Sequence, residues 1–133
     1  MEKVFLSRLE PSFAAALLRG CERLDPRGLA TPPDIDRMTD AGQCFAATTD
    51  HKAQAVYVLT VKNGVAWIDA AKGQGAADWT ALLLPIVEAQ AQGLASVAFQ
   101  TARPGLVKKA QAQGYDITGW VMRKRIQPQT NRA

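Results

Sequence analysis

The chain has 133 residues, 47% of them hydrophobic, and a formal net charge of +4 at pH 7. This length and apolar content suit one domain with its own core, and no apolar run is long enough to cross a membrane. The modest basic excess lacks the interleaved aromatic side chains that stack on bases, and Cys21 and Cys44 lack the spacing of a disulfide framework or a zinc site, so neither nucleic acid nor a metal is expected.

The first part of the chain reads as a strand followed by two helices. "VFLSRL" alternates apolar and polar residues, as a half-buried strand does. The charged residues Glu2, Arg8 and Glu10 interrupt the apolar core that a signal peptide needs, so we expect a cytoplasmic protein. "EPSFAAALLRGCERL" and "PDIDRMTDAG" have helical periodicity, and the loop between them is rich in proline and glycine.

Three strands are predicted next, in the segments "QCFAATT", "AQAVYVLTV" and "VAWIDAA". A short turn, "DHK", separates the first two. Asn63-Gly64 separates the last two, and this dipeptide is a strong signal for a two-residue hairpin. Strands joined by such tight turns form an antiparallel meander.

The second part of the chain alternates helices and strands. "ADWTALLLPIVEAQAQG" is helical in period, and Pro85 is predicted to kink it. "ASVAFQT" reads as a short buried strand, and "RPGLVKKAQAQG" reads as a helix that ends at Gly114. In "YDITGWVMRKRI" the alternation of side chains predicts a closing strand.

The expected order of elements is therefore β-α-α-β-β-β-α-β-α-β. It predicts an α+β fold, with a mixed, mostly antiparallel central sheet and helices on both of its faces. We expect a single domain over residues 1–126 and a C-terminal tail over residues 127–133.

The turn between "VAWIDAA" and the following helix has the composition of a phosphate site. Backbone N–H groups at a helix start attract anions, Gly73 and Gly75 would allow a ligand to approach closely, and Lys72 would add a positive charge. A Walker loop needs its lysine after the last glycine, and a dinucleotide fingerprint needs glycine or alanine where Asp78 stands. The turn therefore suits neither of these nucleotide sites.

The segment "KGQGAA", residues 72–77, resembles the pattern Arg/Gln-x-x-Gly-x-Gly/Ala of the GNAT family of N-acetyltransferases. The ending of the chain is similar too, because an alanine-containing helix precedes Gly114-Tyr115 and a strand with Met122-Arg123-Lys124, where the family has Gly-Phe or Gly-Tyr and Met-x-Lys. The expected element order also matches over nearly the whole chain. The chain thus resembles a short GNAT member with eroded motifs.

This resemblance implies that the protein binds acetyl-coenzyme A or coenzyme A. The two strands "VAWIDAA" and "ASVAFQT" would splay apart to admit the pantetheine arm. From the residues alone, the glycine turn also fits a plain strand-to-helix connection. The resemblance assigns pairing with the pantetheine arm to Ile68, Asp69 and Ala70, and pyrophosphate binding to Lys72, Gly73, Gln74, Gly75, Ala76 and Ala77.

Three positions depart from the family pattern. Gln111 stands where many members have a tyrosine that reprotonates the leaving thiolate, and a glutamine cannot act as that acid. Pro104 stands where many members have an asparagine. Asp78 would place a negative charge near the proposed phosphate pocket.

Two residues are candidates for the chemistry. Asp69 lies on the strand that would face the thioester and is the candidate base, although it would equally face solvent or cap the turn. Tyr115 is the candidate acid if the helix register differs from our count, and otherwise a half-buried aromatic of the sheet.

Two functions of different classes follow. The first is an acyl-coenzyme A-dependent N-acyltransferase that transfers acetyl to a small amine or to an amino group of a protein. The second is a protein that kept the fold but lost catalysis and serves a binding, accessory or structural role; compressed proteins of this type resemble those that bacteriophages encode. In the second case we expect side chains such as Gln74, Asp78 or Trp79 to fill the place where pantetheine enters.

Overall fold

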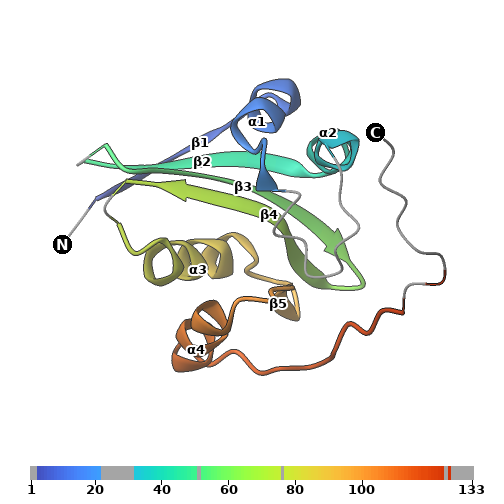
Figure 1. Cartoon of the computed structure of the whole chain (residues 1–133). Helices are drawn as coiled ribbons and strands as arrows, with labels where there is room; N and C mark the ends of the chain where they lie inside the picture. The colour runs from blue at the N-terminus through green and yellow to red at the C-terminus, as the bar shows by residue number, and fades with distance from the viewer. Residues whose placement is uncertain (1–2, 22–31, 51, 76, 125, 127–133) are drawn as a thin grey trace.

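The computed structural model describes residues 3–21, 32–50, 52–75, 77–124 and 126. These residues form a sheet with helices on both faces, α1 and α2 on one face and α3 and α4 on the other (Figure 1). No helix in the described ranges has the length and apolar character needed to cross a bilayer. In chain order the elements are β1 (Val4–Arg8), α1 (Pro11–Leu17), α2 (Pro32–Ala41), β2 (Gln43–Thr49), β3 (Gln54–Lys62), β4 (Val65–Gln74), α3 (Trp79–Gln90), β5 (Ser96–Phe99) and α4 (Pro104–Ala112).

In the described part of the chain the sheet has five strands, in the order β1-β2-β3-β4-β5. The first three pairings are antiparallel, and β4 and β5 pair in parallel. The parallel pair requires a crossover, which α3 provides. The predicted α+β class and mixed, mostly antiparallel sheet are confirmed.

The predicted hairpin at Asn63-Gly64 is confirmed as a two-residue turn between β3 and β4. Lys62 pairs with Val65 across it. Asn63 has a φ of 53° and Gly64 a φ of 76°, which is the left-handed geometry that matches the natural twist of two antiparallel strands. The turn fixes the register of β4 against β3 from Val65 to Ile68, beyond which the register shifts.

The middle strand β3 separates two apolar clusters. Val56 and Val58 point to the face that α1 and α2 cover, where they pack with Leu18. Tyr57 points to the opposite face, where it packs with Val87 of α3. Because successive side chains of a strand alternate between faces, a nearly continuous apolar run is required in a strand that is covered on both sides.

The predicted closing strand is wrong for the part of the segment that the structure describes. Residues 115–124 belong to no strand, and every one of them from residue 116 onward is exposed. The alternating pattern is present, but a strand also needs a neighbouring edge to pair with, and this segment pairs with none of the described strands. The predicted tail over residues 127–133 lies outside the described residues.

The first helix is also shorter than predicted. α1 ends at Leu17, and Gly20 follows with a φ of 94°, a left-handed conformation in which an α-helix cannot continue. The rest of the segment predicted as helix, from residue 22 to residue 24, is outside the described residues.

Candidate functional site

The strands β4 and β5 pair over only part of their common length. Val65 to Ile68 of β4 pair with Ser96 to Phe99 of β5, and there the ladder ends. β4 runs on to Gln74, so that its edge from Asp69 to Gln74 has no strand partner on the β5 side among the described residues. An unpaired edge offers a row of backbone N–H and C=O groups to an extended ligand.

A β-bulge at Asp69 marks the point where the ladder with β5 ends. Ala70 pairs with Val58 and Ile68 pairs with Leu59, so Asp69 has no counterpart on β3. A bulge bends and twists its strand locally. The Asp69 side chain accepts a hydrogen bond from the Thr60 hydroxyl at 2.7 Å through its Oδ2 atom.

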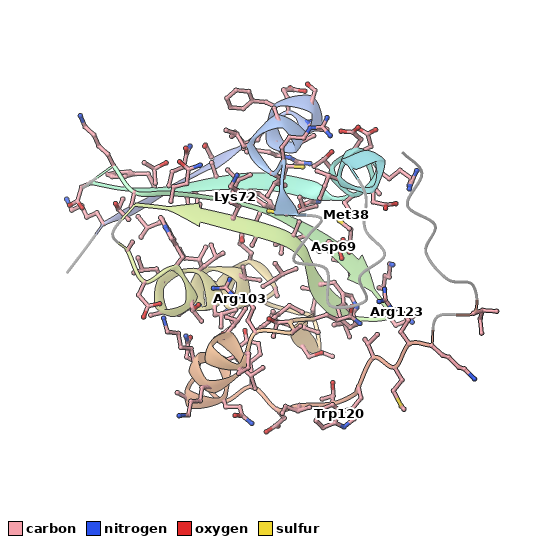
Figure 2. All side chains as sticks on the ribbon, viewed as in Figure 1. Met38, Asp69, Lys72, Arg103, Trp120 and Arg123 are labelled. Carbon is pink, nitrogen blue, oxygen red and sulfur yellow. The ribbon has the colours of Figure 1, made fainter. Side chains whose placement is uncertain are left out.

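A cavity of about 1140 Å³ opens along this edge. Its walls are residues 67–73 of β4, the first two turns of α3, and residues 99–106, which lead from β5 into α4. Cys21 and Met38 line it from the side of α1 and α2. The predicted site residues Ile68, Asp69 and Ala70 therefore line the same cavity. Figure 2 labels Asp69 and Met38, which lie in the right-hand part of the sheet in that view.

The predicted glycine turn is wrong at its start, because β4 is longer than the sequence indicated. Lys72, Gly73 and Gln74 belong to the strand, where they pair with β3 residues 54–56. The turn begins at Gly75, whose φ of 90° and whose closeness to Ala53, 2.7 Å from a Cβ placed there, both require glycine. Ala77 follows in the turn, and Ala76 is outside the described residues.

The start of α3 carries its own negative charge. Asp78 is the N-cap residue, and its carboxylate accepts a hydrogen bond from the Ala81 N–H at 3.4 Å. The same oxygen lies 3.4 Å from the Nζ atom of Lys109 on α4. A phosphate at this helix start would meet the Asp78 carboxylate, which already makes the interaction that an anion makes with a helix N-terminus.

Trp79 lies over the end of β4. Its indole Nε1 donates to the Gln74 carbonyl oxygen at 3.1 Å, and a Cβ on Gly73 would lie 2.9 Å from the Trp79 Cγ atom. Gly73 thus serves the packing of this indole against the strand. Trp79 also lines the cavity.

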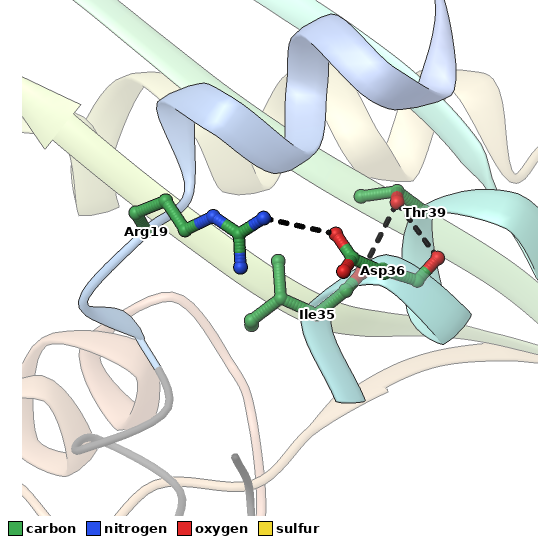
Figure 3. A network of polar contacts seen from close by, with 4 residues as sticks. All are labelled: Arg19, Ile35, Asp36 and Thr39. Atoms are coloured by element: carbon green, nitrogen blue, oxygen red, sulfur yellow. Dashed lines mark hydrogen bonds and ion pairs between the residues drawn. The ribbon is translucent and has the colours of Figure 1, made fainter. Parts of the chain in front are cut away.

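Lys72 points to the opposite face of the sheet from α3. Its Nζ donates to the Arg19 carbonyl oxygen at 3.1 Å, just after the end of α1. The Arg19 side chain pairs with Asp36 at 3.3 Å, and Thr39 donates to the Ile35 and Asp36 carbonyl oxygens in the same region (Figure 3). The Lys72 ammonium therefore connects β4 to α1 in this structure and does not lie at the start of α3.

The helix α4 also brings positive charge to the cavity. Arg103, its N-cap residue, and Lys109 both line the cavity. Neither was predicted as a site residue, although both stand in the basic segment "RPGLVKKAQ". Their role depends on where α4 packs, which charge and periodicity alone do not specify.

Tyr115, the candidate acid, is not among the residues that line the cavity. Its hydroxyl donates to Glu88 Oε2 at 2.9 Å, and its ring packs against Phe99 with centroids 5.7 Å apart. Burial raises the pKa of Tyr115 well above its ordinary value, and the nearby Glu88 raises it further. Such a hydroxyl holds its proton strongly.

No protein-family model and no curated protein matches this chain. Solved acetyltransferase structures do match it. The IAA acetyltransferase from Bacillus cereus ATCC 14579 is 20% identical, with a TM-score of 0.59 over 84% of this chain and 75% of that one. The aminoglycoside N-acetyltransferase AAC(6')-Iy, solved in complex with CoA, is 17% identical, with a TM-score of 0.53 over 94% and 95% of the two chains. A GNAT-family structure from Xanthomonas campestris pv. campestris is 16% identical, with a TM-score of 0.53 over 95% of both chains.

At these identities the likeness concerns the path of the chain and not its chemistry. The matches nevertheless cover most of this chain, between 84% and 95% of it. The chain therefore has the fold of the GNAT acetyltransferases.

Proposed function

We propose that this protein is an acyl-coenzyme A-dependent N-acyltransferase that transfers acetyl to an amine. The observation that carries the proposal is the β4 edge from Asp69 to Gln74, which has no strand partner on the β5 side among the described residues and lies beside a cavity of about 1140 Å³. The pantetheine arm of coenzyme A is extended and contains amide groups, so it can pair with this edge as an added strand would. The amine acceptor is either a small molecule or an amino group of a protein.

The lining residues fit the coenzyme at both of its ends. Ile68 and Ala70 offer backbone groups and apolar surface beside the arm. Arg103 and Lys109 offer positive charge to the phosphates, a role for which guanidinium and ammonium groups are well suited. When bound, acetyl-coenzyme A supplies an acyl group that is already activated as a thioester.

Asp69 is the base in this proposal. Its carboxylate accepts the proton that the amine loses as the nitrogen bonds to the thioester carbon and the carbon–sulfur bond breaks. The Thr60 hydroxyl occupies Oδ2, which orients the carboxylate. Solvent returns a proton to the leaving thiolate, because Tyr115 does not line the cavity and Gln111 has no acidic proton to give.

A second function, ligand binding without catalysis, is favoured by the start of α3. There Asp78 already makes the N-cap interaction, and the Trp79 indole packs against Gly73. Both features oppose a phosphate at the turn. We would expect both features in a protein that has kept the fold but has lost acyl transfer.

Coenzyme binding can be tested with the two cysteines of the chain. Cys21 lines the cavity, whereas Cys44 is 2% exposed and burial raises its thiol pKa. We expect coenzyme A to slow alkylation of Cys21 by iodoacetamide, measured by peptide mass spectrometry, and to raise the melting temperature. Cys44 is the internal control, because a thiol that is buried and protonated reacts slowly in either state.

The outcome separates the two functions. The protein is also incubated with acetyl-coenzyme A and a panel of primary amines and basic peptides, and the release of free coenzyme A is measured chromatographically. Binding together with such release supports the transferase. Binding without any release supports the second function. If millimolar coenzyme A changes neither Cys21 alkylation nor the melting temperature, the proposal that this cavity takes the coenzyme is wrong.

A further inference from the structure

Lys72 is a charged residue of the cavity to which the proposed function gives no role. Its Nζ donates to the Arg19 carbonyl oxygen at 3.1 Å, so the ammonium lies on the side of α1. In the described part of the chain the Lys72 side chain makes no other hydrogen bond or ion pair. Because an ammonium has three N–H groups, Lys72 can still donate to an anion in the cavity that it lines.

Asp69 and Lys72 reach the same face of the sheet, the one that α1 and α2 cover (Figure 1). Lys72 pairs with Val56, whose side chain packs in the cluster on that face. Thr60 lies an even number of residues from Val56 along β3, so it points to the same face, and it donates to Asp69. In a regular strand residues 69 and 72 would face opposite sides. The β-bulge at Asp69 therefore brings both side chains to one face.

A smaller recess of about 250 Å³ adjoins the large cavity at Lys72. Arg103 lines both spaces, and Arg19 lines the recess with its guanidinium paired to Asp36 at 3.3 Å. No acidic side chain of the described ranges lines this recess, and Asp69 borders the large cavity alone. We call the recess between Arg19, Lys72 and Arg103 the basic recess. The space thus has a carboxylate at one point and a basic recess beside it.

We infer that the amine acceptor is a small ω-amino acid, whose amine lies at Asp69 and whose carboxylate lies at Lys72. The inference rests on the proposed acyl transfer and narrows its acceptor. The amine nitrogen bonds to the acyl carbon and loses a proton to Asp69, the carbon–sulfur bond breaks, and the thiolate takes a proton from solvent. The products are an N-acetyl amino acid and free coenzyme A.

The spacing of the two residues favours an amine at the ω position. Cα atoms three residues apart along a strand are separated by at most about 10 Å. Asp69 and Lys72 form no ion pair with each other, so their charged groups are not in contact. An acceptor with several methylene groups between amine and carboxylate can reach both. In an α-amino acid the two groups are attached to the same carbon atom, which places them closer together than the two side chains.

The charges around the cavity disfavour an acceptor that carries a second positive charge. Among the described residues that line it, Asp69 is the acid, and the bases are Lys62, Lys72, Arg103 and Lys109. A diamine or a basic peptide would bring a further cation into this surplus of positive charge, whereas a carboxylate at Lys72 reduces the surplus. The charge of the lining thus agrees with an acceptor whose far end is anionic.

The acceptor class is tested with ε-aminocaproate and its neutral amide, which have the same chain length and the same reacting amine. With saturating acetyl-coenzyme A at low salt, kcat/KM should be about tenfold higher or more for the acid, the usual effect of a hydrogen bond to a charged group. The preference should weaken as salt is added. Glycine should be a poorer acceptor than ε-aminocaproate.

Variants of Lys72 test whether this residue holds the carboxylate. Lys72→Met should raise KM for ε-aminocaproate by about tenfold and remove the preference over the amide, with KM for the amide unchanged. Lys72→Arg keeps the positive charge and should keep the preference. The matched control is Lys108→Met, which removes an exposed lysine of α4 that lines neither space and should change none of these constants.

A binding measurement does not depend on transfer. In the presence of free coenzyme A, calorimetry should show that ε-aminocaproate binds more tightly than its amide, and that Lys72→Met removes the difference. An oxyanion at Lys72 would come either from the acceptor or from the phosphates of the coenzyme. We expect Lys72→Met to leave the affinity for coenzyme A unchanged, which places the acceptor and not the phosphates at Lys72.

Four results would overturn the inference. They are equal kcat/KM for the acid and the amide, a preference that survives Lys72→Met, loss of the preference in Lys72→Arg as well, and weaker binding of coenzyme A to Lys72→Met. Absence of transfer to every amine would contradict the proposed function instead. In that case the calorimetry still decides whether the cavity binds an ω-amino acid through Lys72.

Discussion

Asp69 is the residue on which a catalytic role for the cavity depends. It lies at the β-bulge, it lines the cavity, and the Thr60 hydroxyl holds one of its carboxylate oxygens. Asp69→Asn keeps the shape of the side chain and removes its basicity. We expect acyl transfer to fall by about 100-fold or more, the usual contribution of a general base. Coenzyme binding, measured by calorimetry, should be unchanged.

The control for Asp69→Asn is Asp40→Asn, which neutralises an exposed carboxylate at the end of α2 outside the cavity. It should leave transfer unchanged. Full activity of Asp69→Asn would show that the carboxylate is not the base, and that solvent deprotonates the amine.

Gly73 and Gly105 should respond to the same substitution with opposite signs. A Cβ on Gly73 would collide with the Trp79 indole, whereas a Cβ on Gly105 meets nothing within 4 Å. Gly73→Ala should lower the free energy of unfolding by about 1–3 kcal/mol, the usual cost of overpacking. Gly105→Ala should raise it by up to about 1 kcal/mol, since alanine is the better helix former.

Urea denaturation followed by tryptophan fluorescence measures both glycine variants. Gly73→Ala should also change the native emission spectrum, because the Trp79 indole must move. A stable Gly73→Ala protein with an unchanged spectrum would contradict the position of Trp79 over β4.

The start of α3 is the element that decides how well the cavity can hold a phosphate. Asp78 caps this helix and pairs with Lys109. Asp78→Asn retains a side chain that caps a helix well but removes the negative charge. We expect coenzyme A to bind several-fold more tightly to this variant at low salt, measured by calorimetry, with little change in stability.

Asp78→Ala distinguishes the effect of the negative charge on coenzyme binding from the effect of the helix cap on stability. It should also bind the coenzyme more tightly, but its free energy of unfolding should fall by about 1 kcal/mol, because the cap is lost. If neither variant changes coenzyme affinity, the phosphates do not lie near the start of α3.

At the scale of the whole molecule, ionisation of Tyr57 is expected to lower the stability of the fold at alkaline pH. It is fully buried between the sheet and α3, its hydroxyl donates to Gln90 at 2.7 Å, and burial raises its pKa to about 12. In the unfolded chain a tyrosine ionises near pH 10. The folded state therefore keeps this proton where the unfolded state has lost it, and the free energy of unfolding should fall as pH rises from about 10 to 12.

In Tyr57→Phe the free energy of unfolding should fall less steeply with pH above about 10. At neutral pH the substitution should lower it only slightly, because Gln90 is exposed and can form a hydrogen bond to water instead. Urea denaturation at a series of pH values measures the slope. An equal slope in the variant and the parent protein would mean that other groups, Tyr115 first among them, cause the decline.

Local patterns in the sequence predicted most of the elements. The Asn63-Gly64 hairpin was predictable because its left-handed geometry depends on two adjacent residues. The end of β4 was not, because Lys72 to Gln74 are held in the strand by hydrogen bonds to β3, which glycine-rich composition does not reveal. The sequence predicted that Ile68, Asp69 and Ala70 lie on one strand, and this strand borders the cavity, while the positions of Arg103, Lys109 and Thr60 depended on packing.

By itself the sequence determined the class of fold, the order of the elements as far as α4 and the strand that borders the cavity, because periodicity and turn chemistry act over a few residues. Only the tertiary structure decided that Lys72 turns to α1, that Trp79 covers Gly73, and that residues 115–124 pair with none of the described strands. Each of these depends on which distant surfaces meet. Burial, charge pairing and strand pairing are properties of such contacts, and a local pattern cannot specify them.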